Sequence, residues 1–308
     1  MGLVTLMRPA KSLAVATDVL AGYCVASEAM PRGAEAMAQV PLLFAGAAML
    51  GAAGGVFDAC FAAAQEAESS PARGPAPDGS LKGAFLAGAA LALGGVFAVM
   101  AGGVSAGRFP VYFAAFMFLL SWARAGRGPD AVLGPVASGL ARAFAMGLGM
   151  SARPEVVYLT RAEPIIAAAL AFASGALAEC IEQAEHEGSR RWLLVVAAAG
   201  LLAVSGAAGA TLMRRPLAWI VAASGGALVL ARAVPAVRTL LPIAVRRFGE
   251  AAAVGTCFLN SAICFGRWPA EGAVLAMGAG ALAMVLACAA LFERYAPAGL
   301  RGPAGEAA

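Results

Sequence analysis

Four ionisable side chains stand inside long apolar stretches of the sequence: Asp18, Asp58, Arg142 and Arg232. Arg232 lies close to the end of its stretch, where a long side chain can reach the membrane interface. A charged group at the middle of a membrane costs about 2.5–3.5 kcal/mol on insertion scales, so such groups usually face a partner or a water-filled cavity. Asp18 could pair with an arginine only to hold helices together, or it could face a cavity. Asp58 is followed directly by a loop with further ionisable groups, and this arrangement predicts a pocket that is open to water at the end of its helix.

A second acidic group occurs in the segment ECIEQAEHEGSRR, residues 179–191. Glu179, Gln183 and Glu187 recur every four residues and therefore share one face of a helix. Carboxylates at a helix C-terminus oppose the macrodipole, so this face requires a compensating cation. The two arginines that end the segment are one candidate. The other is a hard cation such as Mg²⁺, which binds through one or two carboxylates together with substrate phosphates.

The composition places these residues in a membrane protein. Of 308 residues, 61% are hydrophobic and only 13% are charged, and the mean hydropathy is +0.80. These values lie outside the range of soluble domains. A spanning helix needs about 20 mostly apolar residues. The candidate spans are Ser12–Met30, Pro41–Ala64, Gly83–Gly103, Phe109–Ala123, Val132–Met150, Pro164–Cys180, Trp192–Met213, Leu217–Val234, Ala251–Phe265 and Pro269–Phe292.

This pattern predicts an all-α fold, an integral membrane helical bundle that forms a single polytopic domain over residues 1–295, followed by a disordered C-terminal tail at 296–308. Between the eighth and ninth candidate spans, residues 236–247 form an amphipathic piece that we expect to lie in the membrane interface. It carries Leu240, Leu241, Ile243 and Val245 beside Arg238, Arg246 and Arg247. The six cysteines show no C-x-x-C spacing, and no block of basic residues suggests nucleic acid as a partner.

The distribution of Lys and Arg predicts the orientation. With the N-terminus in the cytoplasm, most basic loop residues fall on the cytoplasmic side, as the positive-inside rule requires. The loop after Asp58 and the acidic segment 179–191 then both face the cytoplasm. We therefore expect an integral protein of a bacterial inner membrane whose N-terminus and acidic loops are cytoplasmic.

Five segments resemble the UbiA superfamily of membrane prenyltransferases. LMRPAKSLAVATDVLAGYCVA resembles its first span, where Arg8 and Pro9 match an R-P-x-N element and Lys11 replaces the Asn. GGVFD, which ends at Asp58, resembles a reduced first aspartate-rich motif that has Ala62 at its last aspartate. PARGPAPDG resembles the loop that follows this motif. LGPVASGLARAFAMGLGMS and EQAEHEGSRR are similar to members often called EboC-type, and the match covers roughly residues 6–191.

The resemblance implies a bundle of about nine transmembrane helices around a cavity that opens to the cytoplasm and to lipid. In this family Mg²⁺, held by two acidic motifs, binds a prenyl diphosphate, and the prenyl group passes to an aromatic or other lipid-soluble acceptor. Carried over by position, the metal ligands are Asp58, Glu182 and Glu185, the residues for diphosphate are Arg73 and Arg142, and the catalytic candidates are Asp58, Arg142 and Asp18.

Two other functions stay open. Because the first motif keeps one aspartate, catalysis could be lost, and the bundle would then be a lipid-embedded binding or export component for a secondary metabolite. A small transporter is the third reading, and it would need paired intramembrane charges in discontinuous helices. The geometry discriminates: a shared metal–diphosphate site requires Asp58 and residues 179–187 on one membrane side, within about 15 Å of each other.

Overall fold

The described part of the protein is all-helical. A computed structural model describes residues 7–27, 34–69, 78–104, 107–125, 133–152, 162–186, 191–213 and 215–267. These residues form nine α-helices and no strand, which confirms the predicted fold class. The helices are α2 (Pro9–Ala26), α3 (Ala34–Ser69), α4 (Asp78–Gly103), α5 (Phe109–Ala125), α6 (Leu133–Met150), α8 (Ala162–His186), α9 (Arg191–Leu212), α10 (Pro216–Thr239) and α11 (Pro242–Arg267).

Six of these helices contain segments long and apolar enough to cross a membrane. The segments are Ala38–Gln65, Leu81–Gly103, Ala162–Ala184, Arg191–Leu212, Pro216–Thr239 and Pro242–Arg267, and α5 is a shorter apolar helix. Their outer faces carry large exposed apolar side chains such as Phe97 on α4 and Trp219 on α10. Such surfaces are suited to lipid, so the chain is a membrane protein.

Each of the first nine predicted spans corresponds to one helix, and the ends differ by up to nine residues, at the start of α11. The interfacial piece predicted at residues 236–247 is wrong. The helix α10 continues to Thr239, Leu240 takes a left-handed conformation with φ 54°, and α11 begins at Pro242. Proline suits the first turn of a helix because it has no N–H to satisfy. The amphipathic piece therefore contains a tight turn between two helices and no separate interfacial helix. The predicted span Pro269–Phe292 and the tail at 296–308 lie outside the described residues.

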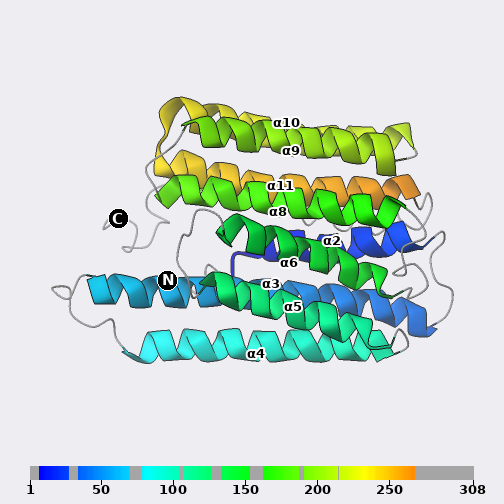
Figure 1. The fold of residues 1–308 in the computed structure, drawn as a ribbon, viewed down its shortest axis with the longest axis horizontal. Coiled ribbons are helices and arrows are strands. Elements are labelled where there is room, and N and C mark those ends of the chain that lie inside the picture. Colours follow the sequence, from blue (N-terminus) through cyan, green and yellow to red (C-terminus); the bar gives the residue numbers. More distant parts are fainter. Residues whose placement is uncertain are drawn as a thin grey trace, which may run out of the picture.

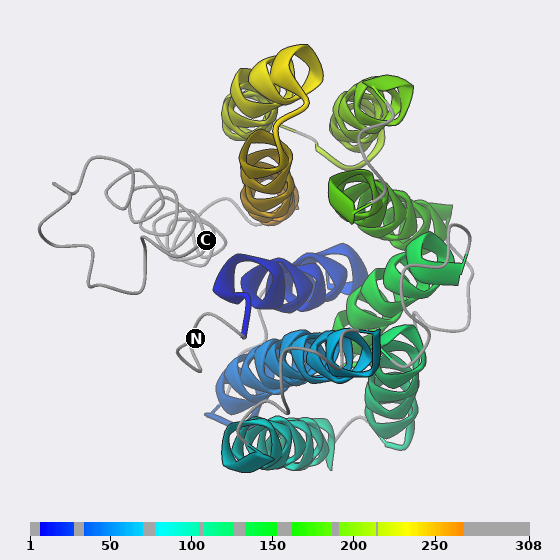
Figure 2. The same cartoon turned by 90° about the vertical axis from the view of Figure 1, so that its left-hand side faces the viewer.

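The helices run side by side as a bundle (Figure 1). Seen end-on, they form an arc from α4 through α5, α6 and α8 to α9 and α10, and α2 lies on its inner side between α3 and α11 (Figure 2). Most residues of α2 are buried. In this central position α2 contacts α3, α6, α8 and α11.

The close approach of α2 to α6 depends on two glycines. A side chain at Gly22 would collide with the backbone of Met146, and one at Gly149 would collide with the backbone of Val19. Apolar burial cannot drive association within lipid, so close backbone packing through small residues takes its place. The contact sets the distance between α2 and α6 and thereby allows their buried polar side chains to meet.

Candidate functional site

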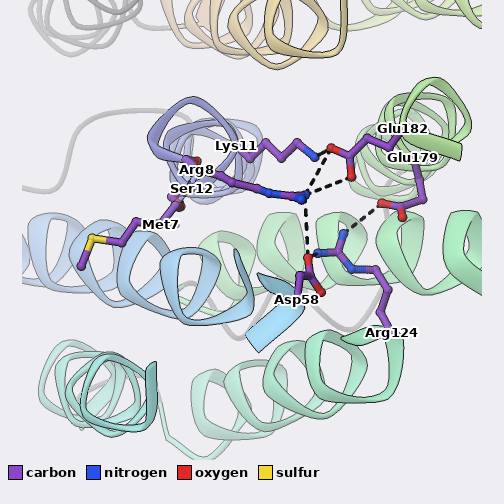
Figure 3. A network of polar contacts seen from close by, with 8 residues as sticks. All are labelled: Met7, Arg8, Lys11, Ser12, Asp58, Arg124, Glu179 and Glu182. Carbon is purple, nitrogen blue, oxygen red and sulfur yellow. Dashed lines mark hydrogen bonds and ion pairs between the residues drawn. The ribbon is translucent and has the colours of Figure 1, made fainter. Parts of the chain in front are cut away.

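Six charged side chains meet at one end of the bundle and form what we call the polar cluster (Figure 3). They come from the start of α2, from the C-terminal half of α3 and from the ends of α5 and α8, which lie far apart in the sequence. Its members are Arg8, Lys11, Asp58, Arg124, Glu179 and Glu182.

Arg124 joins the two acidic helices. Its Nη1 donates a hydrogen bond to Glu179 Oε2 at 2.9 Å, and its Nη2 donates to Asp58 Oδ2. The guanidinium is planar and presents several donors in a fixed fork, so one arginine can hold two carboxylates at once. The acidic faces of α3 and α8 therefore converge on one side chain.

The start of α2 closes the other side of the cluster. Arg8 Nη1 lies 3.1 Å from Glu182 Oε2 and 3.9 Å from Asp58 Oδ2, and Lys11 Nζ pairs with Glu182 Oε1. Arg8 has a φ of 45°, a conformation that is uncommon for residues other than glycine. The hydroxyl of Ser12 donates to the Met7 carbonyl at 2.8 Å and stabilises this turn. Strained residues of this kind are frequent at functional sites.

Neighbouring side chains fix the orientation of both acidic helices. Phe57, next to Asp58, packs against Phe85, Phe118 and Trp122, with ring centroids 5.5, 6.4 and 5.2 Å away. These rings come from α4 and α5, so they hold α3 against the helix that carries Arg124. Aromatic pairs of this geometry stabilise by about 0.5–1.5 kcal/mol beyond their burial.

On the other side, Gly134 of α6 leaves room for the α8 side chains. A Cβ at this position would lie 3.0 Å from Gln183 Nε2 and 3.6 Å from Glu179 Cγ. The missing side chain allows the polar face of α8 to pack directly against α6, and Glu179 is thereby aimed at Arg124.

A second polar group lies deeper in the bundle. Arg142 Nη2 donates to Asp18 Oδ1 at 2.8 Å, and Arg142 Nε donates to Asp18 Oδ2. Asn260 of α11 donates to Asp18 Oδ1 at 2.7 Å and to Thr17 Oγ1 at 3.1 Å. All four side chains are buried. Lys11 and Asp18 are seven residues apart, so this group lies about 10 Å below the polar cluster along α2.

The structure brings together some predicted site residues and separates others. Asp58 and Glu182 both contact Arg8, so the two acidic motifs meet as the shared site requires. Asp18 and Arg142 instead pair with each other in the deeper group. Arg73 and the side chain of Glu185 lie outside the described residues, and their predicted roles stay predictions.

Sequence reasoning missed the cationic half of the site. From the sequence, Arg8 and Lys11 belong only to a family motif, and Arg124 has no assigned role. One signal could have found them. The spans alternate in direction, so the start of α2 and the ends of α5 and α8 must all reach the same membrane side.

The chemistry of the carboxylates suits a hard cation, but their present partners are cations of the chain. Among the described residues, no three His, Cys, Asp or Glu side chains lie together as a metal site. Mg²⁺ often binds through only one or two carboxylates plus substrate phosphates. Asp58 and Glu182 can bind Mg²⁺ in this way if Arg8, which now contacts both carboxylates, moves away. The magnesium site therefore stays a prediction, and the chemistry of these two carboxylates is compatible with it.

The sequence matches no protein-family model, and no curated protein is similar to it. A solved structure is similar to it, that of a digeranylgeranylglyceryl phosphate synthase in membranes. The TM-score is 0.54 and the sequence identity 15%, over 86% of this chain and 97% of that chain. At this identity the likeness shows the fold alone, so the chain shares the helical fold of that membrane protein. The resemblance to the UbiA superfamily and to its EboC-type members stays a prediction.

Proposed function

We propose that this protein is a UbiA-type membrane prenyltransferase, which transfers a prenyl group from a prenyl diphosphate to an aromatic or other lipid-soluble acceptor. The observation that supports it best is the convergence of Asp58 and Glu182. The two residues belong to separate acidic motifs of the sequence. The same nitrogen, Arg8 Nη1, lies 3.9 Å from Asp58 Oδ2 and 3.1 Å from Glu182 Oε2. The fold shared with a membrane prenyltransferase supports the same reaction class.

In this proposal the polar cluster binds the diphosphate end of the substrate. Arg8, Lys11 and Arg124 are cationic and meet its negative oxygens, as catalysis of diphosphate departure requires. Mg²⁺, held by Asp58 and Glu182 and by the predicted ligand Glu185, would neutralise the charge that develops on the leaving diphosphate. The prenyl chain lies among the apolar faces of the helices, where exclusion of water protects an allylic cation.

The deeper group serves to position the site. Catalytic roles for Asp18 and Arg142 were predicted from the resemblance, but these two side chains are buried and each satisfies the other. They connect α2 to α6, and Asn260 adds α11. Their contribution in this proposal is to hold α2 at the depth that brings Arg8 and Lys11 to the carboxylates of the cluster.

A second candidate function is the binding or export component without catalysis. The observation that favours it is the ion pairing of each carboxylate in the cluster: Asp58 and Glu179 with Arg124, and Glu182 with Lys11. Ala62, one turn after Asp58, supplies no carboxylate at the position of the motif's last aspartate. A bundle that binds a lipid without metal could retain such a closed cluster.

Diphosphate release separates the two candidates. Purified full-length protein in lipid nanodiscs is incubated with geranylgeranyl diphosphate, Mg²⁺ and a lipid extract as acceptor source. We expect release that falls at least about 100-fold in Asp58→Asn, the magnitude typical of losing one group that stabilises developing charge. Glu250→Gln, on the exposed face of α11, is the matched control and keeps wild-type release. Absence of release with prenyl chains of any length supports the non-catalytic candidate.

A further inference from the structure

The turn that joins α10 to α11 carries a surplus of positive charge (Figure 1). Residues 232–247 contain four arginines and no carboxylate. We call these four side chains the arginine hairpin: Arg232, Arg238, Arg246 and Arg247. The hairpin lies at the same end of the bundle as the polar cluster, because Gly249 of α11 lies beside Ile181 of α8.

The chain compensates little of this charge. Glu250 is the first carboxylate after the hairpin, and its Oε1 lies 3.8 Å from Arg246 Nε, with both side chains about half exposed. The side chains of the other three arginines form no ion pair or hydrogen bond within the described part of the chain. In the polar cluster, by contrast, every cation contacts a carboxylate. The hairpin therefore has three cations left for a ligand.

Arg232 lies too deep to be an ordinary surface charge. It stands seven residues before Thr239, the last residue of α10, which is about 10 Å along the helix axis. At this level of α10, Leu230 and Val234 expose 43% and 46% of their surface, so the surroundings are suited to lipid. A dissolved anion would lose its hydration on reaching this depth, which is costly. The phosphate of a lipid already lies next to the hydrocarbon.

Arg232 and Arg247 lie on one side of the α10–α11 pair. Leu228 is one turn before Arg232, and Val254 is two turns after Arg247, so each shares a helix face with its arginine. These two apolar side chains belong to the same apolar cluster. Because the helices are antiparallel, the two arginines are within about two turns of each other along the axis. Two side chains of this length can reach a common phosphate.

The other side chains at the turn favour an amphipathic ligand. Leu241 and Ile243 are 54% and 58% exposed and stand between Arg238 and Arg246 in the sequence. Apolar and basic side chains thus occupy the same level, where a phospholipid places its phosphate next to its acyl chains. A zwitterionic headgroup brings its own cation, which the unpaired arginines repel. A headgroup with net negative charge is attracted, as in basic pockets between transmembrane helices.

We infer that the arginine hairpin is a binding site for an anionic glycerophospholipid. Arg232 and Arg247 contact its phosphate, Arg238 and Arg246 attract it from the membrane surface, and its acyl chains run toward the middle of the membrane beside Leu228. With the predicted orientation, this lipid belongs to the cytoplasmic leaflet. No step of the proposed prenyl transfer enters this inference, so the proposed function can fail without affecting it.

Substitutions that remove the two deep cations test the site. Arg232→Gln, Arg247→Gln and the variant with both changes keep a polar side chain of similar length but take away the charge. Arg215→Gln is the matched control, because Arg215 is an exposed arginine at the start of α10, at the opposite end of the same helix. It changes the net charge of the chain by the same amount as each single variant.

The measurement is lipid binding to full-length protein in detergent micelles, by native mass spectrometry and by the shift in unfolding temperature. The probes are dioleoyl phosphatidylglycerol, dioleoyl phosphatidylcholine and sodium phosphate. For the wild type we expect at least about tenfold tighter binding of phosphatidylglycerol than of phosphatidylcholine, a difference of about 1.4 kcal/mol. The double variant should bind both lipids equally, and Arg215→Gln should keep the preference. Sodium phosphate should not displace phosphatidylglycerol.

Equal binding of the two lipids by the wild type would overturn the inference. The same holds for a preference that persists in the double variant when circular dichroism shows that it is folded, or one that Arg215→Gln removes as well. Displacement by sodium phosphate would assign the arginines to a soluble anion instead. If the double variant does not fold, the single variants decide: each should lower the preference at least about threefold, and an unchanged preference in both contradicts the site.

Discussion

Asp18 and Arg142 form a buried ion pair, and its contribution to the free energy of unfolding depends on both partners being present. We expect Asp18→Leu to destabilise the protein by about 3–5 kcal/mol, because Arg142 would be left without its counter-charge. The double variant with Asp18→Leu and Arg142→Met removes both charges and should recover most of that loss. Unfolding in mixed micelles at increasing SDS concentration measures these differences. Equal destabilisation by the single and double variants would show that the pair contributes through packing and not through charge.

At Arg124 the shape of the cation should matter as much as its charge. Arg124→Lys keeps the positive charge, but an ammonium cannot span Asp58 and Glu179 with the fixed fork that the guanidinium provides. We expect at least about a tenfold rise in the KM for prenyl diphosphate, equivalent to about 1.4 kcal/mol, because α3 and α8 are no longer held together. Steady-state kinetics of diphosphate release checks this. An unchanged KM in Arg124→Lys would mean that charge alone is sufficient.

Among the helices, the crossing of α2 and α6 should be the most sensitive to side-chain volume. Gly149→Ala places a Cβ against the Val19 carbonyl and the Tyr23 amide, which are backbone atoms that cannot rotate away. We expect a loss of about 1–3 kcal/mol in the free energy of unfolding, as for other overpacked cores. Gly206→Ala on α9 is the matched control, since a Cβ there meets nothing within 4 Å. It should leave stability unchanged or raise it by up to about 1 kcal/mol.

The helices themselves could be predicted from the sequence because the length of an apolar run sets the length of a membrane span. The turn at Leu240 could not, since an amphipathic pattern is shared by an interfacial helix and by two span ends that meet at a turn. In the site, the carboxylate of Asp58 could be predicted from its cost in an apolar helix. Its partner Arg124 could not, because the meeting of the ends of α3, α5 and α8 is a property of tertiary packing.

For the whole molecule, the alternating directions of the helices give a prediction of orientation. The polar cluster lies where α2 begins and α8 ends, and the start of α11 reaches the same end, because Gly249 lies beside Ile181 of α8. Arg215, between α9 and α10, lies at the opposite end. The positive-inside rule then predicts Arg246 in the cytoplasm and Arg215 outside.

Single cysteines introduced into a cysteine-free variant test this orientation. Both positions are exposed, so a maleimide should reach each one from its own side of the membrane. In intact spheroplasts a membrane-impermeant maleimide should label Arg215→Cys and leave Arg246→Cys unlabelled, and after lysis it should label both. The reverse pattern would place the polar cluster on the outer side. A cluster there would face away from a cytoplasmic supply of prenyl diphosphate, so the orientation experiment bears on the proposed function as directly as the site variants do.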